Sequence, residues 1–141
     1  MELVFVTANA HKAAEVQTVV STTIKIVSLK DINCSDDIEE TANTFQGNAL
    51  LKAKHIYNKY YKNCFADDSG LEVEALNNEP GVFSARYAGV TKSDEKNTAK
   101  LLKNLEGIEN RKARFRTVIA LIFDGKEYLF EGIIEGTIAQ Q

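Results

Sequence analysis

A pair of long strand patterns joined by a tight turn constrains the fold of this chain more than any other feature. Residues 113–123 are rich in apolar and β-branched side chains, and residues 127–138 form a second long pattern of the same kind. Asp124-Gly125 lies between them, and this dipeptide favours a hairpin turn. We therefore predict an antiparallel pair of long strands late in the chain.

Earlier residues alternate between strand patterns and helical patterns. The expected strands are residues 3–6, 24–29 and 71–76. The expected helices follow Lys12, with Val16, Val19 and Val20 on one side, and begin again near Thr44 and Ser93. Helices between early strands and long strands at the end predict an α/β domain with a mixed sheet.

Composition restricts the cell compartment and the partners. The chain has 141 residues, the size of one domain, and a net charge of −3 gives it no overall attraction for nucleic acid or anionic membranes. Its apolar runs are too short for a membrane span. Cys34 and Cys64 lack the spacing of a redox or metal motif, so we expect reduced cysteines in a cytoplasmic protein.

Two adjacent carboxylates, Asp67 and Asp68, follow a short apolar run and precede Ser69-Gly70. Neighbouring residues on a strand point to opposite faces, so we expect the strand to end at this pair. Like charges this close are stabilised by a divalent cation with oxygen ligands, and Mg²⁺ is the metal that we favour. A simple polar turn is the alternative, because all four residue types form turns readily.

A polar loop follows the first expected strand. Thr7, Asn9 and Lys12 lie between that strand and a helix, where free N–H groups and the helix dipole favour an anion such as phosphate. Alternatively, Asn9 only caps the helix and Lys12 is solvated. The loop lacks the glycines of a Walker loop or of a dinucleotide fingerprint.

An acidic loop and then a clear helical pattern come next in the sequence. Residues 31–43 read as a solvated acidic loop, with Glu40 placed just before the helix that starts after Thr44. Asn48 and Lys52 lie one turn apart on that helix and could face one ligand. His55 is expected to be structural or exposed, and we expect no metal-binding or catalytic histidine.

Taken together, several motifs resemble the inosine triphosphate pyrophosphatase family in order and spacing. The motifs are Thr7-x-Asn9-x-x-Lys12, Glu40-Thr41, Thr44-Phe45-x-x-Asn48-Ala49-x-x-Lys52-Ala53, Asp67-Asp68-Ser69-Gly70-Leu71 and Pro80-Gly81-Val82-x-Ser84-Ala85-Arg86-Tyr87-Ala88-Gly89. The resemblance extends from residue 2 to about residue 138. It implies a two-lobed α/β fold around a long curved mixed sheet with flanking helices.

The resemblance also implies an activity. Members of the inosine triphosphate pyrophosphatase family hydrolyse noncanonical purine nucleoside triphosphates such as ITP, dITP and XTP to the monophosphate and pyrophosphate. They use Mg²⁺ and act as cytoplasmic homodimers. Carried onto this chain, the loop of Thr7, Ala8, Asn9, Ala10, His11 and Lys12 would bind the triphosphate. Lys52 would add positive charge, and Ser69 would contact substrate. Glu40 and Asp68 would hold Mg²⁺, and Asp68 would also be the proposed general base. The roles of Glu39, Asp67 and Arg86 in the site stay open.

The chain departs from the family pattern at its end. The family's Gly-Phe-Gly-Tyr-Asp-Pro-like and Ser-His-Arg segments, which contribute much of the nucleobase contact, have no counterpart before Gln141. We therefore expect one domain over residues 1–141 that lacks the C-terminal part of the small lobe. The alternatives to an active enzyme are a catalytically impaired nucleotide-binding or dimer-forming fragment and, more weakly, a Maf-like pyrophosphatase.

Overall fold

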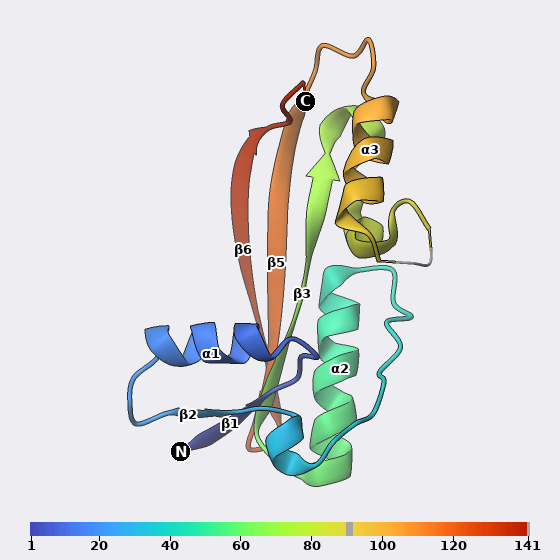
Figure 1. The fold of residues 1–141 in the computed structure, drawn as a ribbon. Coiled ribbons are helices and arrows are strands. Elements are labelled where there is room, and N and C mark those ends of the chain that lie inside the picture. The colour runs from blue at the N-terminus through green and yellow to red at the C-terminus, as the bar shows by residue number, and fades with distance from the viewer. Residues whose placement is uncertain (90–91, 141) are drawn as a thin grey trace. The chain divides into compact units, whose positions relative to one another are not determined.

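The computed structural model describes residues 1–89 and 92–140, which form a mixed β-sheet with helices (Figure 1). The strands are β1 (Glu2–Phe5), β2 (Lys25–Val27), β3 (Cys64–Val73), β4 (Glu79–Pro80), β5 (Lys112–Phe123) and β6 (Lys126–Thr137). The helices are α1 (Ala10–Val19), α2 (Phe45–Tyr60) and α3 (Asp94–Asn104), with 3-10 turns at Lys30–Ile32, Glu74–Leu76 and Gly81–Arg86.

The sheet order is β2-β1-β3-β5-β6, with β4 paired to β3 off this path. Strand β1 runs parallel to both β2 and β3, whereas β4 is antiparallel to β3. Parallel and antiparallel pairs in one sheet confirm the predicted mixed-sheet α/β class.

Contacts group the chain into two compact units. The first unit contains Met1–Asp68 and Val118–Phe130, and the second contains Ser69–Thr117 and Glu131–Gln141. Because the division falls between Asp68 and Ser69, β3 contributes residues to both units.

In the core of the first unit, α2 contacts β3, where the Cys64 thiol donates to Ala53 O at 3.2 Å. Phe5 and Phe65 are register partners on the parallel strands β1 and β3, and their rings stack with centroids 4.4 Å apart. Thr44 caps α2 by accepting the Gly47 N–H at 2.9 Å. Phe45, Ala49, Ala53 and Ile56, spaced along one side of α2, are all buried, and Tyr60 at the end of the same apolar stripe is half-buried.

Helix α1 is attached differently, because none of its residues is buried and Val19 is 81% exposed. The predicted helix is confirmed, but its valines do not form a buried face. Gln17 instead joins α1 to β2: its Nε2 donates to Ile24 O at 3.0 Å, and its Oε1 accepts the Ile26 N–H at 2.7 Å. A single amide side chain therefore satisfies one backbone group of β2 and one of the residue just before it.

The second unit has its own core, formed by Val73, Tyr87, Leu101 and Leu105 between β3 and α3. Burial raises the pKa of the Tyr87 hydroxyl. That hydroxyl donates to Glu79 at 3.1 Å and accepts from Asn104 at 2.8 Å. The buried phenol is therefore hydrogen-bonded on both sides, as a polar group in a core requires.

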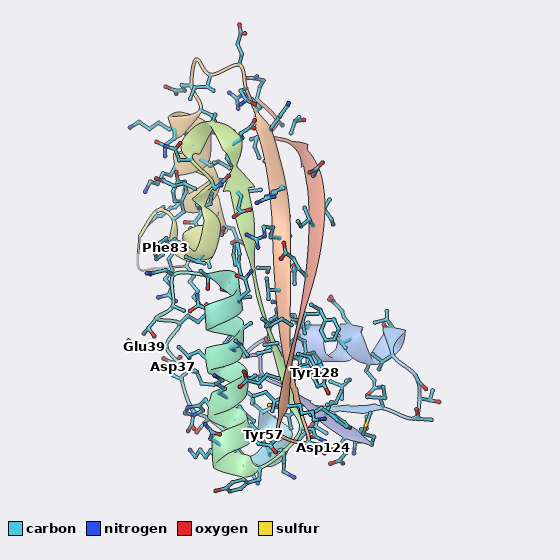
Figure 2. The ribbon with its side chains drawn as sticks, turned by 180° about the vertical axis from the view of Figure 1, so that it is seen from behind. Asp37, Glu39, Tyr57, Phe83, Asp124 and Tyr128 are labelled. Atoms are coloured by element: carbon cyan, nitrogen blue, oxygen red, sulfur yellow. The ribbon has the colours of Figure 1, made fainter. Side chains whose placement is uncertain are left out.

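The predicted hairpin is confirmed. Asp124 and Gly125 both have positive φ, 49° and 81°, which is the conformation of the turn that best joins twisted strands. The Asp124 N–H donates to Asn63 Oδ1 at 2.8 Å, and Tyr57 of α2 lies close to the same turn (Figure 2). The turn is thus held against the residues that lead into β3.

Two strand predictions were wrong. Strand β3 does not end at Asp67 and Asp68 but continues to Val73, and residues 74–76 form a 3-10 turn instead of strand. The strand continues because each carboxylate finds its own partner: Lys12 approaches Asp67, and Asn48 donates to Asp68. A polar pair on opposite faces is therefore compatible with a continuous strand.

Replacing Ile56 tests the packing of α2. Ile56 is 0% exposed, so Ile56→Ala leaves a cavity and is expected to lower the free energy of unfolding by about 2–5 kcal/mol. Urea denaturation followed by circular dichroism measures the change, with exposed Asn58→Ala on the same helix as the control. A loss below about 1 kcal/mol would contradict this packing.

Candidate active site

The loop after β1 is organised by its own side chains. The Asn9 side chain accepts the His11 N–H at 3.0 Å and caps α1, while Thr7 Oγ1 accepts the Asn9 N–H at 3.1 Å. Ala8, Asn9, Ala10 and His11 are exposed. The capping interpretation of Asn9 is confirmed, and phosphate binding by this loop stays a prediction.

Lys12 connects this loop to β3. Its Nζ lies 3.2 Å from Asp67 Oδ2 and its side chain is 43% exposed, so the ammonium remains reachable from solvent. The Val6 N–H donates to Phe65 O at 2.8 Å, which places the end of β1 beside the residues that precede Asp67. The carboxyl ends of parallel strands are a common position for ligand sites in α/β sheets.

Lys52 of α2 contacts two acidic elements. Its Nζ donates to the backbone carbonyl of Asp67 and lies 3.2 Å from Glu40 Oε1. The side chain is mostly buried, so its charge acts in an environment with reduced screening. Lys52 therefore holds the segment that carries Glu40 next to β3.

Asn48, one turn before Lys52, provides a second connection without charge. Its Nδ2 donates to Asp68 Oδ2 at 3.2 Å, and its Oδ1 accepts the Ala42 N–H at 2.8 Å. Asn48 and Asp68 are both buried. The sequence correctly placed Asn48 and Lys52 on one side of α2, but it did not reveal that the Asn48 amide bonds the protein at both ends.

The segment before α2 is also tied down by Asp36. Its Oδ2 accepts from Lys59 Nζ at 2.6 Å and lies 2.9 Å from His55 Nε2. These hydrogen bonds, that of Lys59 first, lower the pKa of Asp36. The expectation that His55 is structural or exposed is confirmed, although no motif pointed to Asp36 as its partner.

The structure joins three of the predicted site residues, Lys12, Lys52 and Glu40, through Asp67. Lys12, Lys52, Glu40 and Asp67 form one chain of ion pairs and hydrogen bonds, and Asp68 follows directly on β3. Three other candidate residues do not take part in these contacts. Ser69 is half-buried and begins the second unit, Arg86 is exposed in the turn Gly81–Arg86 of that unit, and Glu39 is exposed beside Asp37 on the segment next to α2 (Figure 2).

Glu40 and Asp68 carry the carboxylate oxygens that Mg²⁺ prefers, and a magnesium site at these two residues stays a prediction. Residues 1–89 and 92–140 contain no cluster of three or more histidine, cysteine or acidic side chains arranged for a metal. Mg²⁺ commonly uses one or two carboxylates together with water and substrate phosphates, so two carboxylates suffice. Asp68 is oriented by Asn48 and Glu40 by Lys52, which is the support that ligand carboxylates require.

In fold and site, the molecule is an α/β protein with carboxylates and lysines gathered where parallel strands meet, an arrangement suited to phosphates and a divalent metal. The Ham1 protein of Staphylococcus aureus has the same fold, with a TM-score of 0.92 and 39% identity over 99% of this chain and 73% of that protein. A HAM1 protein of Coxiella burnetii gives a TM-score of 0.93 and 38% identity over 100% of this chain and 74% of its own.

Curated sequences agree with these structures. The dITP/XTP pyrophosphatase of Flavobacterium johnsoniae is 54% identical over 140 residues, covering 99% of this chain and 73% of the relative. The dITP/XTP pyrophosphatase of Porphyromonas gingivalis is 52% identical, with 99% and 73% coverage. The Ham1 family model matches residues 3–141, and the chain belongs to the Ham1 family. The predicted resemblance to nucleoside triphosphate pyrophosphatases is thereby confirmed.

Gly47 tests how closely α2 and the Glu40 segment are packed. A Cβ at Gly47 would lie 2.7 Å from Ala42 Cβ and 3.0 Å from Thr44 Oγ1. Gly47→Ala is therefore expected to lower the melting temperature, although alanine is intrinsically better than glycine in a helix by about 1 kcal/mol. Differential scanning calorimetry measures the shift.

Asn58→Ala serves as the matched control, because it improves helix propensity at an exposed position of the same helix. A Gly47→Ala protein as stable as the wild type would show that the Ala42 segment gives way without cost.

Proposed function

We propose that this chain hydrolyses dITP, XTP and related noncanonical purine nucleoside triphosphates, ITP included, to the nucleoside monophosphate and pyrophosphate. Membership of the Ham1 family and the activity named for its relatives from F. johnsoniae and P. gingivalis support this function. One observation connects this function to specific residues. Asp68 is buried and oriented by a hydrogen bond from Asn48, and the adjacent Asp67 contacts two lysines.

The loop Thr7–Lys12 and the side chain of Lys52 bind the triphosphate. Residues 8–11 are exposed at the start of α1, where the helix dipole favours an anion, and the N–H groups of Asn9 and His11 would exchange their contacts with Thr7 Oγ1 and Asn9 Oδ1 for phosphate oxygens. Lys12 exchanges part of its contact with Asp67 for phosphate oxygens, and Lys52 adds charge near Glu40. Ser69, the next residue on β3, donates its hydroxyl to the substrate.

Asp68 and Glu40 hold the metal, which we propose to be Mg²⁺. When bound, this cation neutralises the phosphate charge and so stabilises charge that develops as the phosphate bond breaks. Asn48 fixes one oxygen of Asp68, so the carboxylate enters the reaction already oriented.

The reaction is an in-line displacement. A water oxygen forms a bond to the α-phosphorus while the bond between that phosphorus and the bridging oxygen to the β-phosphate breaks, and pyrophosphate leaves. Asp68 orients the water and accepts its proton, which then passes to solvent. A carboxylate is a weak base, so positioning and electrostatic stabilisation contribute more than proton abstraction.

We further propose a cytoplasmic homodimer that acts on free nucleotides. The described helices are all too short or too polar to cross a lipid bilayer, and both cysteines are free and buried. Strand β6 exposes large apolar side chains, including Phe130 and Ile134, as interaction surfaces often do. Light scattering coupled to gel filtration tests the dimer.

The activity itself is tested by pyrophosphate release from dITP and XTP, compared with dATP and dGTP, with and without Mg²⁺. Release that requires Mg²⁺ and favours dITP and XTP is expected. Equal rates with all four nucleotides, or inorganic phosphate as the product, would contradict the proposal.

Asp68→Asn tests the catalytic carboxylate. The amide keeps the size of the side chain but neither accepts the proton nor binds the cation well, so kcat is expected to fall at least about a hundredfold. The melting temperature should change far less than activity. Exposed Asp37→Asn is the control and should retain full activity. An active Asp68→Asn protein would remove Asp68 from the mechanism.

Lys12→Ala tests the triphosphate loop. Loss of one charge-assisted contact to phosphate is expected to weaken dITP binding about tenfold while changing dIMP binding little. Calorimetry with both nucleotides, using the inactive Asp68→Asn background for dITP, measures the difference. Equal losses for the two nucleotides would place Lys12 away from the β- and γ-phosphates.

A further inference from the structure

The side chain of Asn48 is buried and hydrogen-bonded at both ends. It is 2% exposed; its Oδ1 accepts the Ala42 N–H at 2.8 Å, and its Nδ2 donates to Asp68 Oδ2 at 3.2 Å. A residue with so little exposed surface is poorly placed to touch a nucleotide. It is well placed to join two protein segments.

The orientation of this amide is determined by its partners. A backbone N–H can only donate, so the group that faces Ala42 must be the amide oxygen, and the NH₂ group must face the carboxylate of Asp68. The opposite orientation would bring two donors together at Ala42 and two acceptors together at Asp68. No other uncharged side chain of this length offers both functions in one plane.

The two segments that Asn48 joins carry the two proposed metal ligands. Ala42 lies two residues after Glu40, in a stretch that has no regular secondary structure, whereas Asp68 lies within β3. Lys52 supplies a charged link between Glu40 and the Asp67 carbonyl. Asn48 supplies a link that leaves the negative charge of both carboxylates available to a cation.

We infer that Asn48 is a positioning residue that sets the distance and orientation of Glu40 relative to Asp68. This inference rests on the proposed function for its catalytic consequence, whereas its structural consequence can be measured without substrate. Because Asn48 acts through Asp68 and the Ala42 backbone, its loss should lower kcat and leave nucleotide binding nearly unchanged.

The first experiment compares Asn48→Leu with Asn58→Leu, an exposed asparagine of the same helix. For Asn48→Leu, kcat with dITP is expected to fall about tenfold or more while KM changes less than about threefold, since a hydrogen bond to a charged group is lost. Amide hydrogen exchange of the metal-free protein should become faster in residues 39–43, because Ala42 loses its acceptor. Asn58→Leu should change neither quantity.

A folded Asn48→Leu protein with normal kcat, or with unchanged exchange in residues 39–43, would overturn the inference. A rise in KM that accounts for the whole loss of kcat/KM would also overturn it, because Asn48 would then contact substrate.

Asn48→Ala provides a second variant in case Asn48→Leu does not fold. It removes both amide contacts without adding the bulk of leucine, so kcat is expected to fall and exchange in residues 39–43 is expected to become faster. Normal kcat or unchanged exchange in Asn48→Ala would overturn the inference. If the wild type itself releases no pyrophosphate, the proposed function fails, and the exchange of Asn48→Leu against the wild type still decides whether Asn48 holds the segment.

Discussion

Two adjacent carboxylates inside a continuous strand impose the central constraint on this molecule. Because Asp67 and Asp68 point to opposite faces of β3, each needs a stabilising group on its own side. Lys12 supplies a cation to Asp67, and Asn48 supplies an amide donor to Asp68. The loop after β1 and the buried side of α2 must therefore both lie against the same short stretch of β3.

This arrangement explains why a segment without regular structure can carry a site residue. The residues between Asn33 and Thr44 lie outside helices and strands, yet side chains of α2 hold them at three positions. His55 and Lys59 bind Asp36, Lys52 binds Glu40, and Asn48 binds the backbone of Ala42. One helix thus serves as the scaffold for the whole segment, and the apolar stripe that buries α2 also determines where Glu40 lies.

Features with a local cause could be predicted from the sequence. Asp124-Gly125 predicted the hairpin because positive φ at both residues is a property of those residue types. Thr44 and Ser93 marked helix starts because hydroxyl caps act within one turn. The motif spacings identified the family and the residues proposed for its site.

Features with a distant cause could not be predicted in this way. Strand β3 was wrongly expected to end at Asp67 and Asp68. The side chains that stabilise the two carboxylates come from residues 12 and 48, far away in the sequence. The valines near the end of α1 were expected on one side of the helix, but none of them is buried, and the Gln17 side chain attaches the helix instead. The Asn48 amide bonds both Ala42 and Asp68, and no residue type or spacing in the sequence predicts these two hydrogen bonds.

The attachment by Gln17 has a consequence for the margin of the sheet. Strand β2 is at one end of the sheet order, and the Gln17 side chain bonds the Ile26 amide of β2 and the carbonyl of Ile24 just before it, in the way that a neighbouring strand would bond them. An edge whose backbone groups are already occupied is a poor template for a strand from another molecule. The Gln17 side chain therefore disfavours edge-to-edge aggregation at β2, because a strand added at this edge would first have to displace it.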